Sequence, residues 1–199
     1  MAAATNPAGR IGPNAITRVA EALPAHVGAA TTQALFGRAG LLHHLQRPPE
    51  AMVDEGEVRR LHGVLRDVLG ADASAAVARD AGKRTADYLL ARRIPRPVQA
   101  LMRTLPASLA ARLLLAAIRR HAWTFAGSGR FEARAGSPVT LMIRDNPLCL
   151  GLVATAPACD FYASTFERLF AVLVHSRSRV REVACEACGD AACKFEIRW

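Results

Sequence analysis

The 199-residue chain contains few aromatic residues and no long hydrophobic run. Phe, Trp and Tyr make up only 6% of the sequence, so Ala, Leu and Val must supply most of any core. The apolar run at residues 113–118 is far too short to cross a bilayer, which takes about 20 apolar residues. Residues 1–8 lack the hydrophobic stretch of a secretory signal peptide. We therefore expect a cytoplasmic protein.

Acidic residues are in the minority, with 17 Asp and Glu against 26 Lys and Arg and a net charge of +9. Such a charge can favour binding to nucleic acid, to an anionic membrane surface or to a ligand that carries carboxylates. The basic residues are dispersed through predicted helices, with few aromatic residues between them and no known nucleic-acid-binding motif, which argues against nucleic acid. The leucines and arginines of residues 103–120 can form a basic amphipathic helix, so peripheral contact with the inner membrane stays open.

Motifs that bind common cofactors are also missing from the sequence. It contains no G-x-x-x-x-G-K-[ST] loop for ATP, and no G-x-G-x-x-G turn between a strand and a helix for a dinucleotide. Gly127-Ser-Gly129 opens a predicted strand instead. The cysteine spacing does not match a four-thiolate iron–sulfur run. The sequence therefore offers no visible source of electrons for a reduction.

The order of apolar residues predicts an α+β fold, with a helical N-terminal two-thirds and a C-terminal third of mixed strands and helix that share one core. Helical periodicity and Pro or Gly breaks predict helices over 13–23, 25–36, 58–68, 74–93, 98–104 and 107–125. Pro24 is expected to end the first helix, and Gly70 the third. Short runs typical of strands cover 130–135, 139–144 and 148–154, followed by a helix near Asp160 and a hairpin of 179–185 and 192–198.

All five cysteines lie after residue 148, and thiolates gathered in a cytosolic protein usually indicate zinc rather than disulfides. Cys185 and Cys193 lie symmetrically about a central glycine, so a hairpin there would set them opposite each other on one face. Cys159 precedes a predicted helix, whose dipole favours the thiolate. Zinc needs a fourth ligand, for which Glu182 or Cys188 is available. The alternative is that these are ordinary buried cysteines.

A family resemblance rests on Cys159, Glu182, Cys185 and Cys193, followed by Lys194-Phe195. This spacing resembles the 4-vinyl reductase domain family, in whose phenol-sensing members it forms a zinc site of three cysteines and one glutamate. The resemblance implies those four residues as ligands of a structural zinc and leaves Cys188 out, although Cys188 in place of Glu182 is the main rival. It covers about residues 55–199, which leaves residues 1–54 as an N-terminal tail and helical extension.

The resemblance also implies a fold. Members of this family are similar to haem–nitric-oxide-binding and vesicle-tethering proteins, which combine helices with an antiparallel sheet, form a ligand channel and often dimerise. For this chain the resemblance implies a helical N-terminal region, a 4-vinyl-reductase-type domain, a C-terminal hairpin held by zinc, and a homodimer.

Family members of this free-standing kind, with a basic helical N-terminal region, take part in bacteriochlorophyll synthesis. The resemblance therefore implies a protein that binds and delivers a magnesium tetrapyrrole intermediate of the divinyl protochlorophyllide or Mg-protoporphyrin type, with pigment-pathway enzymes as partners. One alternative is the 8-vinyl reductase itself, although that reaction needs two electrons for which no source is visible. Another is a sensor module for a different small hydrophobic ligand.

A tetrapyrrole carrier needs cations for the pigment's carboxylates, an axial ligand for magnesium and aromatic side chains to flank the ring. By these criteria the candidate ligand-binding residues are Arg119, Arg120, His121, His175, Trp123, Tyr162 and Phe166. Each also has a plainer interpretation: the arginines as a solvated helix face, a histidine as a helix C-terminal residue, and the aromatic stripe as core.

Overall fold

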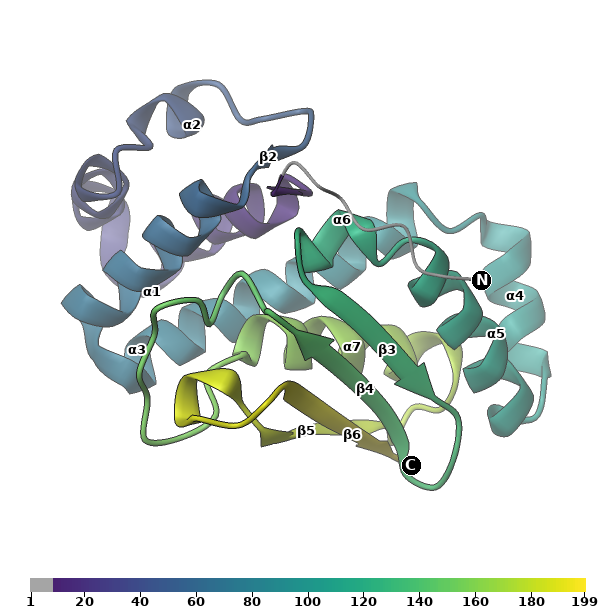
Figure 1. The fold of residues 1–199 in the computed structure, drawn as a ribbon. Coiled ribbons are helices and arrows are strands. Elements are labelled where there is room, and N and C mark those ends of the chain that lie inside the picture. The colour runs from purple at the N-terminus through teal and green to yellow at the C-terminus, as the bar shows by residue number, and fades with distance from the viewer. Residues whose placement is uncertain (1–8) are drawn as a thin grey trace.

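A computed structural model describes residues 9–199, so the prediction about a signal peptide at residues 1–8 lies outside the described part. Its sheet has four antiparallel strands in the order β3-β4-β6-β5 (Figure 1). The strands are β3 (Arg130–Arg134), β4 (Val139–Arg144), β5 (Arg179–Ala184) and β6 (Cys193–Arg198). Alternate side chains of β3, β4 and β6 are buried, which gives the sheet one core-facing side.

Helices cover the buried face of this sheet and form the N-terminal part of the molecule (Figure 1). Helix α7 (Asp160–Leu173) packs against β5 and against the long helix α3 (Glu55–Arg92). Helix α3 in turn packs against α1 (Asn14–Arg38). The remaining helices are α2 (Leu42–Gln46), α4 (Arg96–Thr104), α5 (Ala107–Arg120), α6 (Trp123–Ala126) and the 3₁₀ turn η1 (Glu186–Cys188). The predicted combination of helices with an antiparallel sheet is confirmed.

One hydrophobic core joins the N-terminal helices to the sheet. Ile16 of α1, Leu61 of α3 and Phe170 of α7 are all fully buried in the same cluster. The short strand β1 (Arg10–Ile11) pairs with β2 (Val53–Asp54), directly before α3. The division predicted between residues 54 and 55 falls at the junction of β2 and α3, and it stays a prediction.

Two glycines, and no proline, break the long helices. Gly70 interrupts α3 with φ +78°, so the predicted break there is confirmed. The break predicted at Pro24 is wrong: α1 passes through Pro24 and is interrupted at Gly28, with φ +79°. A helix can lose the one hydrogen bond that proline cannot donate, whereas a positive φ changes the direction of the chain and suits glycine.

The segment after β4 is a turn, and the strand predicted over 148–154 is wrong. Asn146 starts this turn: its side-chain oxygen accepts from the Leu148 N–H at 3.0 Å, and its carbonyl accepts from the Cys149 N–H at 2.9 Å. These local bonds use the backbone groups that a strand would offer to a neighbour. The predicted helix 107–125 is likewise divided into α5 and α6 at His121.

Helices α3 and α7 approach each other most closely at Gly82. A Cβ atom at this position would overlap the carbonyl oxygen of Phe161. The Thr165 hydroxyl, one turn further along α7, donates to the Gly82 carbonyl at 3.0 Å and to the Phe161 carbonyl at 2.7 Å. Gly82 is therefore required by the contact between two backbones and not by its own φ angle.

We expect Gly82→Ala to lower the free energy of unfolding by about 2 kcal/mol, because the helices must separate to admit the methyl group. The matched control is Gly63→Ala, also in α3, where an added Cβ would meet no atom within 4 Å beyond its chain neighbours and the adjoining backbone of its own helix, among residues 9–199. This control should gain up to about 1 kcal/mol from the higher helix propensity of alanine. Urea unfolding followed by circular dichroism measures both, and equal effects would contradict the close α3–α7 contact.

A buried histidine links α3 to α1. The Nε2–H of His62 donates to the carbonyl of Ala15 at 3.2 Å, and its ring packs edge-on against Phe161. Burial, followed by the nearby charge of Arg66, lowers the pKa of His62 from 6.5 to about 4. The folded protein therefore holds this histidine in its neutral form at pH 7.

Stability should fall between pH 6.5 and pH 4, because the unfolded chain then binds a proton at His62 that the folded chain does not. The loss can reach about 3 kcal/mol, at 1.36 kcal/mol per pKa unit. The measurement is the free energy of unfolding against pH for the wild type and for His62→Gln, with His43→Gln at an exposed histidine as control. Only His62→Gln should flatten this part of the curve, and parallel curves for all three would contradict the prediction.

Candidate metal centre

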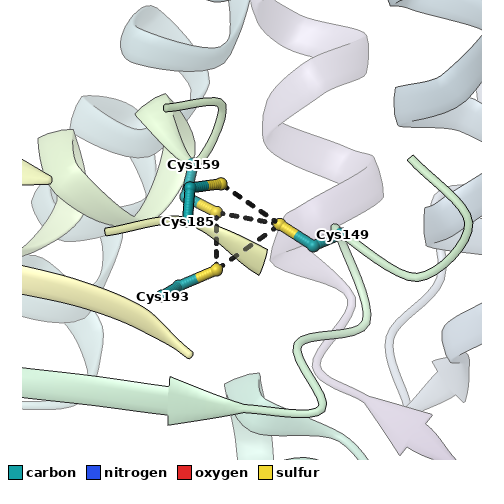
Figure 2. A group of neighbouring side chains, drawn as sticks. All are labelled: Cys149, Cys159, Cys185 and Cys193. Atoms are coloured by element: carbon teal, nitrogen blue, oxygen red, sulfur yellow. Dashed lines mark hydrogen bonds between the residues drawn. The ribbon is translucent and has the colours of Figure 1, made fainter. Parts of the chain in front are cut away.

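Four cysteines from separate segments meet in the core beside the β5–β6 hairpin (Figure 2). Cys149 lies in the turn after β4, Cys159 is the residue before α7, Cys185 follows β5, and Cys193 begins β6. The Cys149 sulfur lies 3.3 Å from that of Cys159, 3.8 Å from Cys185 and 3.5 Å from Cys193. All four side chains are buried.

A bulge in the hairpin sets two of these sulfurs opposite each other. Glu182 pairs with Phe195, but the register then shifts so that Ala184 pairs with Lys194. Continued by one residue, the shifted register sets Cys185 opposite Cys193, as the sequence predicts. The turn between them contains Gly189 with φ +91°, the left-handed conformation that glycine accepts without strain.

The spacing of the sulfurs suits a tetrahedral metal ion. With Zn–S bonds of about 2.3 Å, the sulfurs of a tetrahedron lie about 3.8 Å apart, close to the distances observed here. The side-chain N–H groups of Asn146 donate to the sulfurs of Cys159 and Cys193, both at 3.2 Å. Hydrogen bonds from Cys149 and then Cys159 lower the pKa of Cys185, which favours a metal-binding thiolate.

Glu182, a ligand predicted from the sequence, lies beside the cluster. One oxygen of its carboxylate accepts from the backbone N–H of Cys159 at 2.8 Å. The other oxygen, Oε1, is buried and has no hydrogen-bond partner among residues 9–199. Burial raises the pKa of Glu182 to about 9. An orphaned carboxylate oxygen beside four sulfurs fits a site that holds a cation.

The fourth cysteine of the cluster is Cys149, and the predicted rival ligand Cys188 lies outside it. Cys188, the predicted rival ligand, is exposed on η1, outside the buried cluster. Cys149 belongs to the cluster. The sequence does not predict it as a ligand, because it lies inside an apolar run predicted to form a strand. The one available signal is the preceding Asp145-Asn146-Pro147, a typical turn sequence that would bring Cys149 back toward the sheet.

The predicted pigment-binding residues fall into three groups. Arg119, Arg120, His121 and Trp123 lie together where α5 gives way to α6, and the Arg119 guanidinium donates to the carbonyl of Ala133. Arg120 and His121 are exposed, and Trp123 is 42% exposed. His175 lies beyond the far end of α7, where its Nδ1 accepts from the N–H of Arg177 at 3.2 Å.

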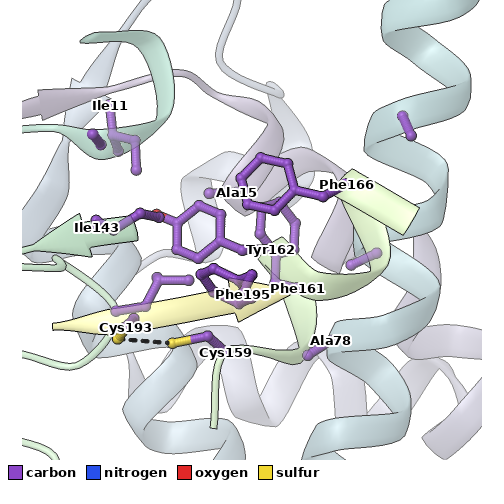
Figure 3. Packing of buried hydrophobic residues seen from close by; sticks show 14 of the residues in the cluster. Ile11, Ala15, Ala78, Ile143, Cys159, Phe161, Tyr162, Phe166, Cys193 and Phe195 are labelled. Carbon is purple, nitrogen blue, oxygen red and sulfur yellow. Dashed lines mark hydrogen bonds between the residues drawn. The ribbon is translucent and has the colours of Figure 1, made fainter. Parts of the chain in front are cut away.

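The third group, Tyr162 and Phe166, belongs to a filled aromatic core (Figure 3). Tyr162 is 2% exposed, and its hydroxyl donates to the carbonyl of Phe125 at 2.8 Å. Phe166 packs edge-on against Phe125 and Phe195. These rings therefore stabilise the interface between α6, α7 and the sheet.

Two surface cavities lie away from all seven predicted pigment-binding residues. One, of about 210 Å³, is lined by Asp54, Glu55 and Arg59 among others. The second, of about 300 Å³, lies between α7 and β5 and reaches Glu182. Charged side chains contribute to the lining of both. Within residues 9–199, no helix is long and apolar enough to cross a membrane.

Comparison with solved structures shows which proteins share this fold. The structure superposes on an H-NOX protein from K. algicida with a TM-score of 0.61, covering 94% of this chain and 96% of that one at 11% identity. It superposes on the phenol-responsive sensory domain of the transcription activator PoxR with a TM-score of 0.53, covering 73% and 74% at 15% identity. These similarities concern the fold alone.

Sequence comparison is more specific. Residues 139–199 match the 4-vinyl reductase domain. The chain is 43% identical to the bacteriochlorophyll synthase 23 kDa chain of Cereibacter sphaeroides, over 94% of this chain and 90% of that protein. It is 41% identical to the protein of the same name from Rhodobacter capsulatus, over 94% and 86%. The chain therefore belongs to the bacteriochlorophyll synthase 23 kDa chain family, with a 4-vinyl reductase domain in its C-terminal part.

Proposed function

We propose that this chain acts in bacteriochlorophyll synthesis by binding a magnesium tetrapyrrole intermediate and delivering it to a pathway enzyme. The observation that carries the proposal is the identity of 43% and 41% to two proteins named as bacteriochlorophyll synthase chains, over nearly the whole length. A solved structure described as modulating haem redox potential through porphyrin distortion also superposes over 95% of this chain, with a TM-score of 0.55. The fold is thus compatible with a porphyrin-type ligand.

We place the pigment over the junction of α5 and α6, because the aromatic core beneath is already filled. His121 is exposed there and can coordinate magnesium through a ring nitrogen. Arg120 is exposed beside it and can pair with a pigment carboxylate. Trp123 offers a half-exposed ring to stack on the macrocycle. His175 is less suitable, because it lies beyond the end of α7, where its Nδ1 already accepts from the N–H of Arg177.

The alternatives are a reductase and a sensor. An 8-vinyl reductase must receive two electrons, and the sequence contains no dinucleotide fingerprint through which this chain would bind a nicotinamide itself. The similarity to a phenol-responsive sensory domain supports a sensor of a small hydrophobic ligand. Sequence identity to pigment-pathway proteins favours a pathway role over a sensor, and the lack of a dinucleotide fingerprint favours delivery over reduction. The homodimer and the docking of pathway enzymes stay predictions.

We further propose that the cysteine cluster holds a structural zinc ion. Cys159, Cys185 and Cys193 supply three thiolates, and the sulfur distances favour Cys149 as the fourth ligand. Glu182, the fourth ligand implied by the family resemblance, is the alternative. A shell made entirely of protein ligands leaves no position for substrate, so the ion would stabilise the hairpin and the turn.

Titration with divinyl Mg-protoporphyrin should shift the Soret band to saturation, and NADPH added afterwards should leave the spectrum unchanged. We expect His121→Ala to weaken binding at least about tenfold, the equivalent of one lost ligand interaction of about 1.4 kcal/mol. His175→Ala is the matched control and should bind as the wild type does. Conversion to a blue-shifted product after NADPH would instead make the protein a reductase, and no shift would exclude pigment binding.

Purified protein should contain one zinc ion per chain, and Cys193→Ser should lose it together with several degrees of thermal stability. Cys188→Ser, at the exposed cysteine, is the control. Cobalt substitution identifies the fourth ligand, because the sulfur-to-metal charge-transfer band strengthens with each thiolate. We expect Cys149→Ser to weaken this band and Glu182→Gln to preserve it. A band of three-thiolate strength that Cys149→Ser leaves unchanged would instead indicate the set of three cysteines and Glu182.

A further inference from the structure

The chain has a long stretch without negative charge. Residues 88–131 contain no Asp or Glu. The same stretch contains eight arginines, namely Arg92, Arg93, Arg96, Arg103, Arg112, Arg119, Arg120 and Arg130. It includes all of α4 and α5, two consecutive helices that both contact α7 and form the right-hand end of the molecule in Figure 1. Helices α4 and α5 therefore contain several arginines and no acidic residue.

Apolar side chains are exposed among these arginines. Of the eleven large hydrophobic side chains exposed within residues 9–199, five fall between residues 98 and 123. Leu101 of α4 is 58% exposed, and Leu113 of α5 is 47% exposed. Along α5, Leu109, Arg112 and Leu113 are all exposed at helical spacing, so leucine and arginine share one face. An exposed face of this composition is rarely left without a partner.

Half of the eight arginines are free to meet an external partner. Arg103 and Arg119 donate to the backbone carbonyls of Val172 and Ala133 and are thereby held in place. Within residues 9–199, no hydrogen bond or ion pair engages four others, which are Arg92, Arg96, Arg112 and Arg120. Guanidinium groups that lack carboxylate partners within the chain can each bind an external anion.

We propose that the exposed face of α4 and α5 docks on the surface of an anionic lipid membrane. The leucines enter the boundary between headgroups and acyl chains, and the arginine stems extend outward so that the guanidinium groups reach lipid phosphates. Trp123 stands 42% exposed just beyond α5 and is a side chain typical of this boundary. No spanning helix is required for such contact.

The charge pattern favours a membrane over the other possible occupants. A second copy of the chain would face the same surface across a two-fold axis and bring arginine against arginine, which is repulsive. Nucleic acid would meet the positive charge but gain nothing from half-exposed leucines. An anionic surface with an apolar layer beneath it satisfies both kinds of side chain.

The test is co-sedimentation of the full chain with vesicles of phosphatidylcholine and phosphatidylglycerol in equal parts, compared with pure phosphatidylcholine vesicles. We expect binding to the anionic vesicles alone, and its loss at high salt, because the arginines meet the surface through screened charges. Arg96→Gln/Arg112→Gln should weaken binding about thirtyfold, from about 1 kcal/mol for each basic residue at the surface. Arg47→Gln/Arg177→Gln removes the same charge elsewhere and should retain most of the binding.

The leucines are tested separately. Leu101→Ser/Leu113→Ser should weaken binding at least about tenfold while the net charge is unchanged. The control, Val68→Ser/Val183→Ser, changes two side chains of similar exposure, 43% and 41%, outside the surface. Equal losses in both arginine variants would overturn the proposal by showing that net charge alone drives binding. It would also be overturned if the wild type did not bind anionic vesicles. A dimer that Leu101→Ser/Leu113→Ser converts to a monomer would overturn it as well, because the surface would then be a dimer interface.

Discussion

The contact between the backbones of α3 and α7 fixes the position of nearly everything that follows it in the chain. The Phe161 carbonyl fills the space beside Gly82, so α7 can lie on α3 in only one register. Cys159, the residue before α7, is thereby placed in the core. From the same helix α3, Arg66 donates to the carbonyls of Leu148 and Ala158. One long helix therefore holds both ends of the turn that supplies two of the four sulfurs.

That turn has few backbone hydrogen bonds to the rest of the protein, which explains where a metal ion would contribute most. The Ala154 N–H donates to the carbonyl of Ala187 at 2.8 Å, and most other bonds of the segment are local. Ordering these residues costs conformational entropy, and because they have no partner in the sheet, few hydrogen bonds to the rest of the protein offset that cost. An ion bound by Cys149 and Cys159 on one side and by the hairpin on the other would supply the missing connection. Because four protein ligands would complete the shell of such an ion, pigment binding would belong elsewhere in the molecule.

The elements that could be predicted from the sequence are those whose signals are local. Strand 139–144, the break at Gly70 and the symmetric placement of Cys185 and Cys193 depend on alternation, on glycine and on hairpin geometry. Pro24 misleads because propensity describes a helix in isolation, whereas the buried face of α1 stabilises it through the proline. Cys149 escapes prediction because its approach to the other sulfurs depends on a turn held by Asn146 and on a distant helix, neither of which leaves a spacing pattern.

The two proposed binding regions meet at the end of α5. The membrane surface comprises the exposed side chains of α4 and α5, and the pigment site begins at Arg120 and His121, where α5 ends. The cysteine cluster lies at the hairpin of β5 and β6, whereas α5 packs against β3 at the other edge of the sheet. Lipid and pigment would share one helix, and any effect of lipid on the affinity for pigment must be matched by an equal effect of pigment on the affinity for lipid. A poorly soluble pigment taken up from the membrane would thus reach His121 without crossing bulk water.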